Sequence, residues 1–306
     1  MKSICTYLQY AAIAAAFTLT HNTAITNANA NTAISLDRNL DSLDLYLPPP
    51  ERTIPLYVPP PEKTSPGICV NSIESVINNI VERQGVNRGK WAILVQSLDG
   101  KTIYSRSPDS YMIPASNVKL LVTAAALQKL NPSSKIRSTS IKEWIKVTNL
   151  RSNNYYANIL LSHIGGSNYL QKALTSLGVD PKGYRLRDGS GLSRNNLITP
   201  RTLVSTLRAM SNAKGKEVFL ASLPVAGESG TLRNRMKGSI AQGTVRAKTG
   251  TLKGVRALSG YIEHPEYGQL AFSIITNQPI NQPAAPVVKA IDEIVMRLST
   301  LTYCQK

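Results

Sequence analysis

The residues from Pro114 to Leu130 constrain this chain more than any other segment. Ser116 and Lys119 stand near its start, and an almost unbroken run of apolar residues follows, which predicts a buried helix over 116–130. Positions three apart share one face of a helix, so the serine hydroxyl and the lysine amine face the same way. A serine becomes a good nucleophile when a neighbouring base takes its proton, and an amine can be that base. The segment therefore predicts covalent catalysis by Ser116 and Lys119 without a histidine.

The same spacing occurs a second time, at Ser211 and Lys214. That copy follows a predicted helix over 200–210 and lies in a polar stretch, where such a pair is most simply a solvated surface feature. The spacing alone is therefore a weak indication of function, and neighbouring motifs must distinguish the two copies.

The order of the predicted elements indicates an α+β fold. Apolar spacing and alternation predict helices at both ends of the folded region, a helical middle section, and strands on either side of it. The helices are expected over 73–81, 116–130, 154–164, 168–177, 200–210 and 287–298, and the strands over 91–96, 102–104, 245–249, 257–262 and 270–276. Short connections between consecutive strands favour an antiparallel sheet. We expect the terminal helices to cover one face of this sheet, and the middle helices to form a subdomain.

The first thirty residues resemble a secretory signal. Lys2 supplies a positive start, Ala11 to Leu19 form an apolar run, and Ala28-Asn-Ala30 is a small-x-small cleavage site. The apolar run is too short to span a bilayer. We therefore expect residues 1–30 to be a signal peptide and the protein to be exported to the periplasm or the cell envelope.

Residues 31–67 are polar and then rich in proline. They contain a near-duplicate, residues 45–55 and 56–66, and each copy holds three consecutive prolines. Triple prolines favour polyproline II and leave no backbone donors for a helix or a sheet. We expect a disordered, semi-rigid linker at 31–67 and a catalytic domain at 68–306; a ligand for a proline-reading partner is the alternative for the linker.

The chain is strongly basic, with a formal net charge of +17. Such a charge favours binding to polyanions. Nucleic acid is an unsuitable partner because the chain is predicted to be exported and its basic residues are dispersed. Peripheral association with anionic envelope polymers or lipid head groups is the favoured interpretation, and a role in solubility alone is the alternative.

The cysteine content leaves one question open. Cys5 belongs to the signal, so the mature chain keeps Cys69 and Cys304, which can pair or stay free in an oxidising compartment. The mature chain holds only two histidines, His163 and His264, so the two cysteines do not belong to a metal-binding motif. The sequence predicts no metal and no organic cofactor.

Three further motifs carry polar groups suited to catalysis. Each also has a simple structural explanation: a helix cap for the first, an edge-strand lysine for the second and a plain turn for the third. They are Ser152-Asn153-Asn154, Lys248-Thr249-Gly250-Thr251 and the glycine-rich loop 187–194, which itself contains a second Ser-x-Asn at Ser193 and Asn195.

In this order the motifs resemble those of the penicillin-recognising serine enzymes, which carry Ser-x-x-Lys, Ser-x-Asn and Lys-Thr-Gly. The chain is most similar to the D-alanyl-D-alanine carboxypeptidase/endopeptidase group of low-molecular-mass penicillin-binding proteins. The resemblance covers about residues 88–300 and is carried by the stretches 114–121, 188–194, 230–238 and 246–252. It implies a fold of the β-lactamase/transpeptidase kind.

The resemblance also implies roles for individual residues. Ser116 would attack the carbonyl of a D-Ala-D-Ala bond, Lys119 would take its proton, and Ser152 would relay a proton to the leaving amine. The substrate would be bound by Asn154, Lys248, Thr249, Gly250 and Thr251, with Thr249 on the terminal carboxylate. The backbone N–H groups of Ser116 and Thr251 would form the oxyanion hole.

One departure from the family concerns the segment between Lys119 and Ser152. The family commonly carries a long insertion with accessory domains there, whereas this chain has only a short connection over 131–151, with one strand or helix around Trp144. The accessory domains flank the cleft and help to select the peptide stem. Asn153 also replaces a frequent aspartate, at a position that is not part of the motif.

The sequence therefore predicts a serine D-Ala-D-Ala carboxypeptidase, with endopeptidase activity also open, that acts on peptidoglycan stem peptides and is inhibited by β-lactams. A β-lactamase-like hydrolase is the alternative enzyme. A peptidoglycan-binding homologue without catalysis is the alternative from another class.

Overall fold

A five-stranded antiparallel sheet forms the centre of the described structure. The computed structural model describes residues 67–304, so the predicted signal peptide and nearly all of the predicted linker lie outside the described residues. The strand order is β3-β2-β10-β9-β8. The bounds are β2 (Lys90–Ser97), β3 (Thr102–Arg106), β8 (Val245–Leu252), β9 (Val255–His264) and β10 (Gly268–Asn277).

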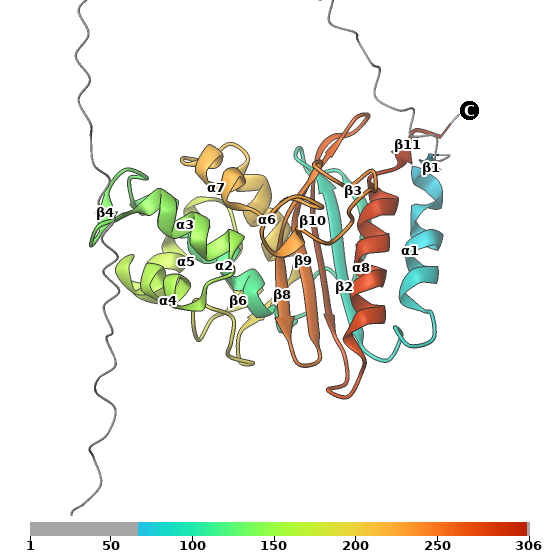
Figure 1. Ribbon diagram of the computed structural model, residues 1–306, viewed down its shortest axis with the longest axis horizontal. Coiled ribbons are helices and arrows are strands. Elements are labelled where there is room, and N and C mark those ends of the chain that lie inside the picture. Colours follow the sequence, from blue (N-terminus) through green and yellow to red (C-terminus); the bar gives the residue numbers. More distant parts are fainter. Residues whose placement is uncertain (1–66, 305–306) are drawn as a thin grey trace, which may run out of the picture. The chain divides into compact units, whose positions relative to one another are not determined.

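Helices cover both faces of this sheet (Figure 1). Two terminal helices, α1 (Ile73–Val81) and α8 (Ala284–Leu298), pack side by side on one face. The central strand β10 is buried along almost its whole length, because both of its faces are covered. Its side chains alternate between two apolar cores, so that Phe272 lies in the core beneath the terminal helices and Ile275 in the other.

The second core belongs to the helices of the middle section. Its centre is α2 (Val118–Lys129), in which every residue from Val118 to Leu127 is buried. The helices that accompany α2 are α3 (Ile141–Leu150), α4 (Asn154–His163), α5 (Gly166–Ser176), α6 (Pro200–Met210) and α7 (Lys216–Ser222). A helix that is apolar on all sides is stable only when neighbours surround it, as they do here.

Short elements complete the chain. Three two-stranded pairs, β1 with β11, β4 with β5, and β6 with β7, lie outside the main sheet. Their bounds are β1 (Ile68–Cys69), β11 (Leu301–Thr302), β4 (Lys135–Ile136), β5 (Thr139–Ser140), β6 (Tyr184–Arg185) and β7 (Leu197–Ile198). The 3₁₀ turns are η1 (Val70–Ser72), η2 (Ala115–Asn117), η3 (Pro181–Gly183) and η4 (Gly230–Leu232). Within residues 67–304, no helix is both long and apolar enough to cross a membrane.

The predicted α+β architecture, with its antiparallel sheet, terminal helices and helical subdomain, is confirmed. The connection over 131–151 holds the hairpin of β4 and β5 and then α3, around the buried Trp144. Two local expectations were wrong. Ser116 lies in the 3₁₀ turn η2 ahead of α2, and the strand expected to end at Thr249 continues to Leu252, so the Lys-Thr-Gly motif lies inside β8.

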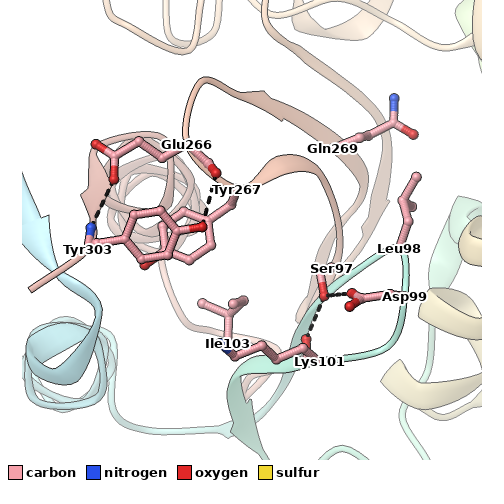
Figure 2. A pocket seen from close by; sticks show the side chains of 9 residues that line it. All are labelled: Ser97, Leu98, Asp99, Lys101, Ile103, Glu266, Tyr267, Gln269 and Tyr303. Atoms are coloured by element: carbon pink, nitrogen blue, oxygen red, sulfur yellow. Dashed lines mark hydrogen bonds between the residues drawn. The ribbon is translucent and has the colours of Figure 1, made fainter.

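The two ends of the described chain are joined covalently. Cys69 and Cys304 form a disulfide across 235 positions, with their Cα atoms 4.8 Å apart, which answers the question that the sequence left open. Next to it, the Tyr303 ring packs against Tyr267 at 4.7 Å, and the Tyr303 N–H donates to the Glu266 carboxylate (Figure 2). The C-terminal segment is thereby held on the turn between β9 and β10.

Replacing Cys304 by serine is expected to lower the free energy of unfolding by about 2–5 kcal/mol, because the bridge restricts the unfolded chain over a very long loop. Urea unfolding with and without reductant measures this. The variant with serine at both Cys69 and Cys304 should unfold at the same midpoint as the single variant and should not respond to reductant. A wild-type midpoint that does not change on reduction would contradict the expectation.

Candidate active site

The nucleophile candidate lies at a tight turn between the sheet and the helical core. Ala115 adopts a left-handed φ of +48°, an unfavourable conformation for a residue with a Cβ. The turn leaves Ser116 half-buried and passes directly into α2, whose second residue is Lys119. The side chain of Lys119 is fully buried, and its Nζ donates to Ser116 Oγ at 2.8 Å.

The Lys119 amine has two more acceptors. It donates to Asn154 Oδ1 at 2.8 Å and to the carbonyl oxygen of Ser190. Burial lowers the pKa of Lys119 to about 8, against a weaker opposing effect of the Asp188 charge. A lysine with such a pKa is partly neutral near neutral pH, so it can accept a proton from the hydroxyl that it contacts.

In the Ser-x-Asn motif, the middle residue caps a helix and the two outer residues contact the buried lysines. Asn153 is the N-cap of α4, and its Oδ1 accepts from the Tyr156 N–H at 3.0 Å. Ser152 has a left-handed φ of +55°. The cap that the sequence suggested is therefore made by the middle residue, which leaves Ser152 and Asn154 to contact the two lysines.

Lys248 is the second buried amine. It belongs to the edge strand β8, yet its side chain is fully buried, which excludes the explanation as a solvated edge lysine. Its Nζ donates to Ser152 Oγ at 2.8 Å and to the Thr249 carbonyl at 2.9 Å. Burial, followed by the nearby charge of Lys119, holds the pKa of Lys248 well below its ordinary value.

The free edge of β8 faces the nucleophile turn. A Cβ on Gly250 would lie 2.6 Å from the carbonyl oxygen of Pro114, so only glycine permits this approach. The Ala247 N–H donates across this edge to Pro224. Because alternate residues of a strand direct their N–H groups to the same side, the Thr251 N–H lies on this edge as well. The edge therefore presents a backbone donor beside Ser116.

The loop 187–194 closes the site from the other side. Burial alone would raise the pKa of Asp188, but hydrogen bonds from the Ser190 hydroxyl and from the N–H groups of Ser193, Gly191 and Ser190 hold it below its ordinary value. The loop is thus a turn built around one carboxylate, and it presents the Ser190 carbonyl to Lys119.

Sequence reasoning assigned no role to two residues that the site depends on. Asn117, between the serine and the lysine, donates to Ser259 Oγ at 2.7 Å, and Ser259 donates to Ser273, so the turn is bonded to the sheet through buried polar groups. Asp188 orders the loop as described above. A buried Asn inside an apolar stretch, and an Asp at the head of a glycine-rich loop, were the available signals.

The other candidate pairs make local contacts instead. Ser211 Oγ donates to the Arg208 carbonyl at the end of α6. Ser193 Oγ accepts from the Asn195 N–H within the loop. Among the described residues, no group of three or more His, Cys, Asp or Glu side chains is placed to hold a metal.

A sequence profile identifies the family. The profile of the D-Ala-D-Ala carboxypeptidase 3 (S13) family matches residues 73–139 and 134–299, which is most of the chain. The chain belongs to this family. The two matched segments overlap at residues 134–139, within the short connection between Lys119 and Ser152.

Curated relatives agree with this assignment over part of their length. The D-alanyl-D-alanine carboxypeptidase of Actinomadura sp. is 47% identical over 164 residues, 48% of this chain and 30% of that protein. The D-alanyl-D-alanine carboxypeptidase DacB of Haemophilus influenzae is 32% identical over 150 residues, 44% of this chain and 31% of that protein. The matches thus span about a third of each relative.

Solved structures confirm the predicted fold class. Penicillin binding protein 4 (dacB) from Haemophilus influenzae, complexed with a novel β-lactam, aligns with a TM-score of 0.63 at 14% identity, over 73% of this chain and 99% of that one. The β-lactamase from Streptomyces albus G aligns with a TM-score of 0.62 at 19% identity, over 76% and 100%. The fold is therefore of the β-lactamase/transpeptidase type.

The pH dependence of acylation is expected to follow Lys119. Since its pKa is about 8, the rate of penicillin acylation should rise about tenfold per pH unit from pH 6 and level off above about pH 8. Stopped-flow or quenched mass spectrometry over pH 6 to 9 measures it. A flat profile would contradict a proton-accepting Lys119, and Lys119→Arg, which stays charged, should be inactive throughout.

Gly191→Ala is expected to slow acylation by at least about tenfold. An added Cβ would lie 2.0 Å from the Ala115 carbonyl oxygen, so the loop and the nucleophile turn must separate. Gly178→Ala is the matched control: Gly178 also has a positive φ, but nothing lies within 4 Å of its added Cβ. Both variants should lose about 1–2 kcal/mol of stability from backbone strain, so equal acylation rates in the two would contradict the steric argument.

Proposed function

We propose that this protein is a serine D-Ala-D-Ala carboxypeptidase that acts on peptidoglycan stem peptides through an acyl-enzyme. The observation that carries the proposal is the pairing of two buried amines with two hydroxyls, Lys119 with Ser116 and Lys248 with Ser152. Acyl transfer needs a nucleophile, a base, a proton donor for the leaving group and a site for the oxyanion. The described residues offer one group for each requirement.

Acylation begins at Ser116. Neutral Lys119 takes the hydroxyl proton as Oγ bonds to the carbonyl carbon of the penultimate D-Ala. The carbonyl oxygen becomes an oxyanion, and the N–H groups of Ser116 and Thr251 stabilise it. The C–N bond then breaks, and the leaving amine takes the proton that Lys119 accepted, relayed through Ser152, whose hydroxyl contacts Lys248.

Deacylation restores the enzyme. Lys119 takes a proton from water as the water oxygen bonds to the ester carbonyl carbon. The Ser116–acyl bond then breaks, Lys119 returns the proton to Ser116 Oγ, and the stem peptide leaves with a new carboxyl group, which ionises. A β-lactam would enter by the same attack, but its opened ring keeps the amine attached, so the leaving group cannot diffuse away.

Substrate binding falls to the groups that line the same site. Asn154, already within reach of Lys119, would hold the peptide backbone. Thr249 would hydrogen-bond the terminal carboxylate, next to the amine of Lys248. The edge of β8 at Gly250 and Thr251 would pair with the extended substrate, since an edge strand offers free backbone groups.

Export of the protein forms part of this proposal. Peptidoglycan lies outside the cytoplasm, and the Cys69–Cys304 disulfide is of the kind that persists in oxidising compartments. The net charge of +17 supports peripheral association with the anionic envelope.

Intact mass spectrometry after incubation with benzylpenicillin, beside an assay of D-alanine release from a synthetic acyl-D-Ala-D-Ala peptide, tests the function. The wild type should gain one penicilloyl adduct and release D-alanine, and Ser116→Ala should do neither. Rapid loss of the adduct with turnover of a chromogenic cephalosporin, and no D-alanine, would favour a β-lactamase. Binding of wall fragments that Ser116→Ala leaves unchanged, with no adduct, would favour a binding protein without catalysis.

A further inference from the structure

A cavity of about 430 Å³ lies next to the proposed catalytic groups and has no part in the mechanism described above. The end of α3 and the segment that begins with η4 form its walls. Gly230 allows these two walls to meet, because its φ is +54° and an added Cβ would lie 2.6 Å from the Leu150 carbonyl oxygen.

The cavity lies on the side of the leaving group. Thr231, which lines it, accepts a hydrogen bond from Thr249 Oγ1 at 2.8 Å, and Thr249 is the proposed ligand of the terminal carboxylate. Arg151, which also lines it, directly precedes Ser152, the proposed proton donor to the leaving amine. A leaving residue whose carboxylate is bound by Thr249 and whose amine takes a proton from Ser152 would have its side chain close to this cavity.

The cavity is positively charged. Three arginines line it, at positions 151, 233 and 235, and no aspartate or glutamate does. Arg235 is neutralised by Asp292 at 2.6 Å, with both side chains largely buried. Arg151 and Arg233 are exposed and form no ion pair within residues 67–304, so two guanidinium groups are available for a ligand.

We propose that this cavity is a subsite for the side chain of the leaving residue, and that Arg151 and Arg233 select leaving residues that carry a second carboxylate. The inference rests on the proposed function. The methyl group of D-alanine is too small and too apolar to use two arginines, whereas a carboxylate accepts paired hydrogen bonds from a guanidinium. The substrates favoured by this subsite are peptides in which a larger, acidic D-residue follows the scissile bond.

Three synthetic peptides with the same acyl-D-Ala donor and with D-Ala, D-Glu or D-Gln as the leaving residue test this. D-Gln matches the size of D-Glu without its charge. In the wild type, kcat/KM for D-Glu should exceed that for D-Gln by about 5- to 10-fold, the range expected for a partly exposed charged contact. The ratio is taken within each variant, so a partial loss of folded protein does not change it.

The double variant Arg151→Gln/Arg233→Gln should bring this ratio to about 1, and Arg151→Lys/Arg233→Lys should retain an intermediate preference. A fourth peptide carries D-Lys as the leaving residue, and Arg233→Glu should cleave it with a higher kcat/KM than the D-Glu peptide. Arg88→Gln, an exposed arginine between α1 and β2, is the matched control and should keep the wild-type ratio.

The two levels of the proposal fail in different ways. If the wild type releases no amino acid from any of the three peptides, the proposed function is overturned, and the subsite with it. If it releases D-Ala but cleaves the D-Glu and D-Gln peptides equally well, or if the double variant keeps the wild-type ratio, the subsite alone is overturned.

Discussion

Burial of two lysine amines within one site is the constraint on which the rest of the structure depends. A charged amine is strongly disfavoured away from water, so each must find polar partners or lose its proton. Lys119 and Lys248 do both: each donates to a serine hydroxyl and a carbonyl oxygen, and each has a lowered pKa. For Lys248, the nearby charge of Lys119 adds to the effect of burial. A site that is unfavourable for cations is therefore one in which an amine can act as a base.

The fold supplies these partners from segments that are distant in the sequence. The turn at Ala115 and Ser116 lies between the edge of β8 and the loop 187–194, and it is bonded to the sheet through Asn117. Gly250 and Gly191 permit the close approach on the two sides. Backbone strain at Ala115 and Ser152 is maintained by the packing around them, which is a common arrangement where side chains must be held ready for chemistry.

Sequence patterns predicted the elements more completely than their contacts. Apolar periodicity located α1, α6 and α8, because burial of one helix face dictates spacing. Nearly continuous apolar runs located α2 and the strands β2 and β10, which are covered on all sides. The short α7 lacked such a signal. The ordered motifs identified Ser116, Lys119, Ser152 and Lys248, but not that Asn153 would take the capping role and free its neighbours. Likewise, the contact of Lys119 with Ser190 and the position of Arg151 and Arg233 around one cavity depend on long-range packing that spacing does not encode.

The bridge between Cys69 and Cys304 also determines how the domain would respond to a pulling force. A load applied through the chain before Cys69, or through the residues after Cys304, enters at one place and passes from one strand end to the other through a covalent bond. The parallel pairing of β1 with β11 lies along the same path. The helices α1 and α8, the sheet, and the two lysine–serine pairs lie outside that path. Tension on the chain ends would therefore leave the geometry at Ser116 unchanged as long as the bridge is intact.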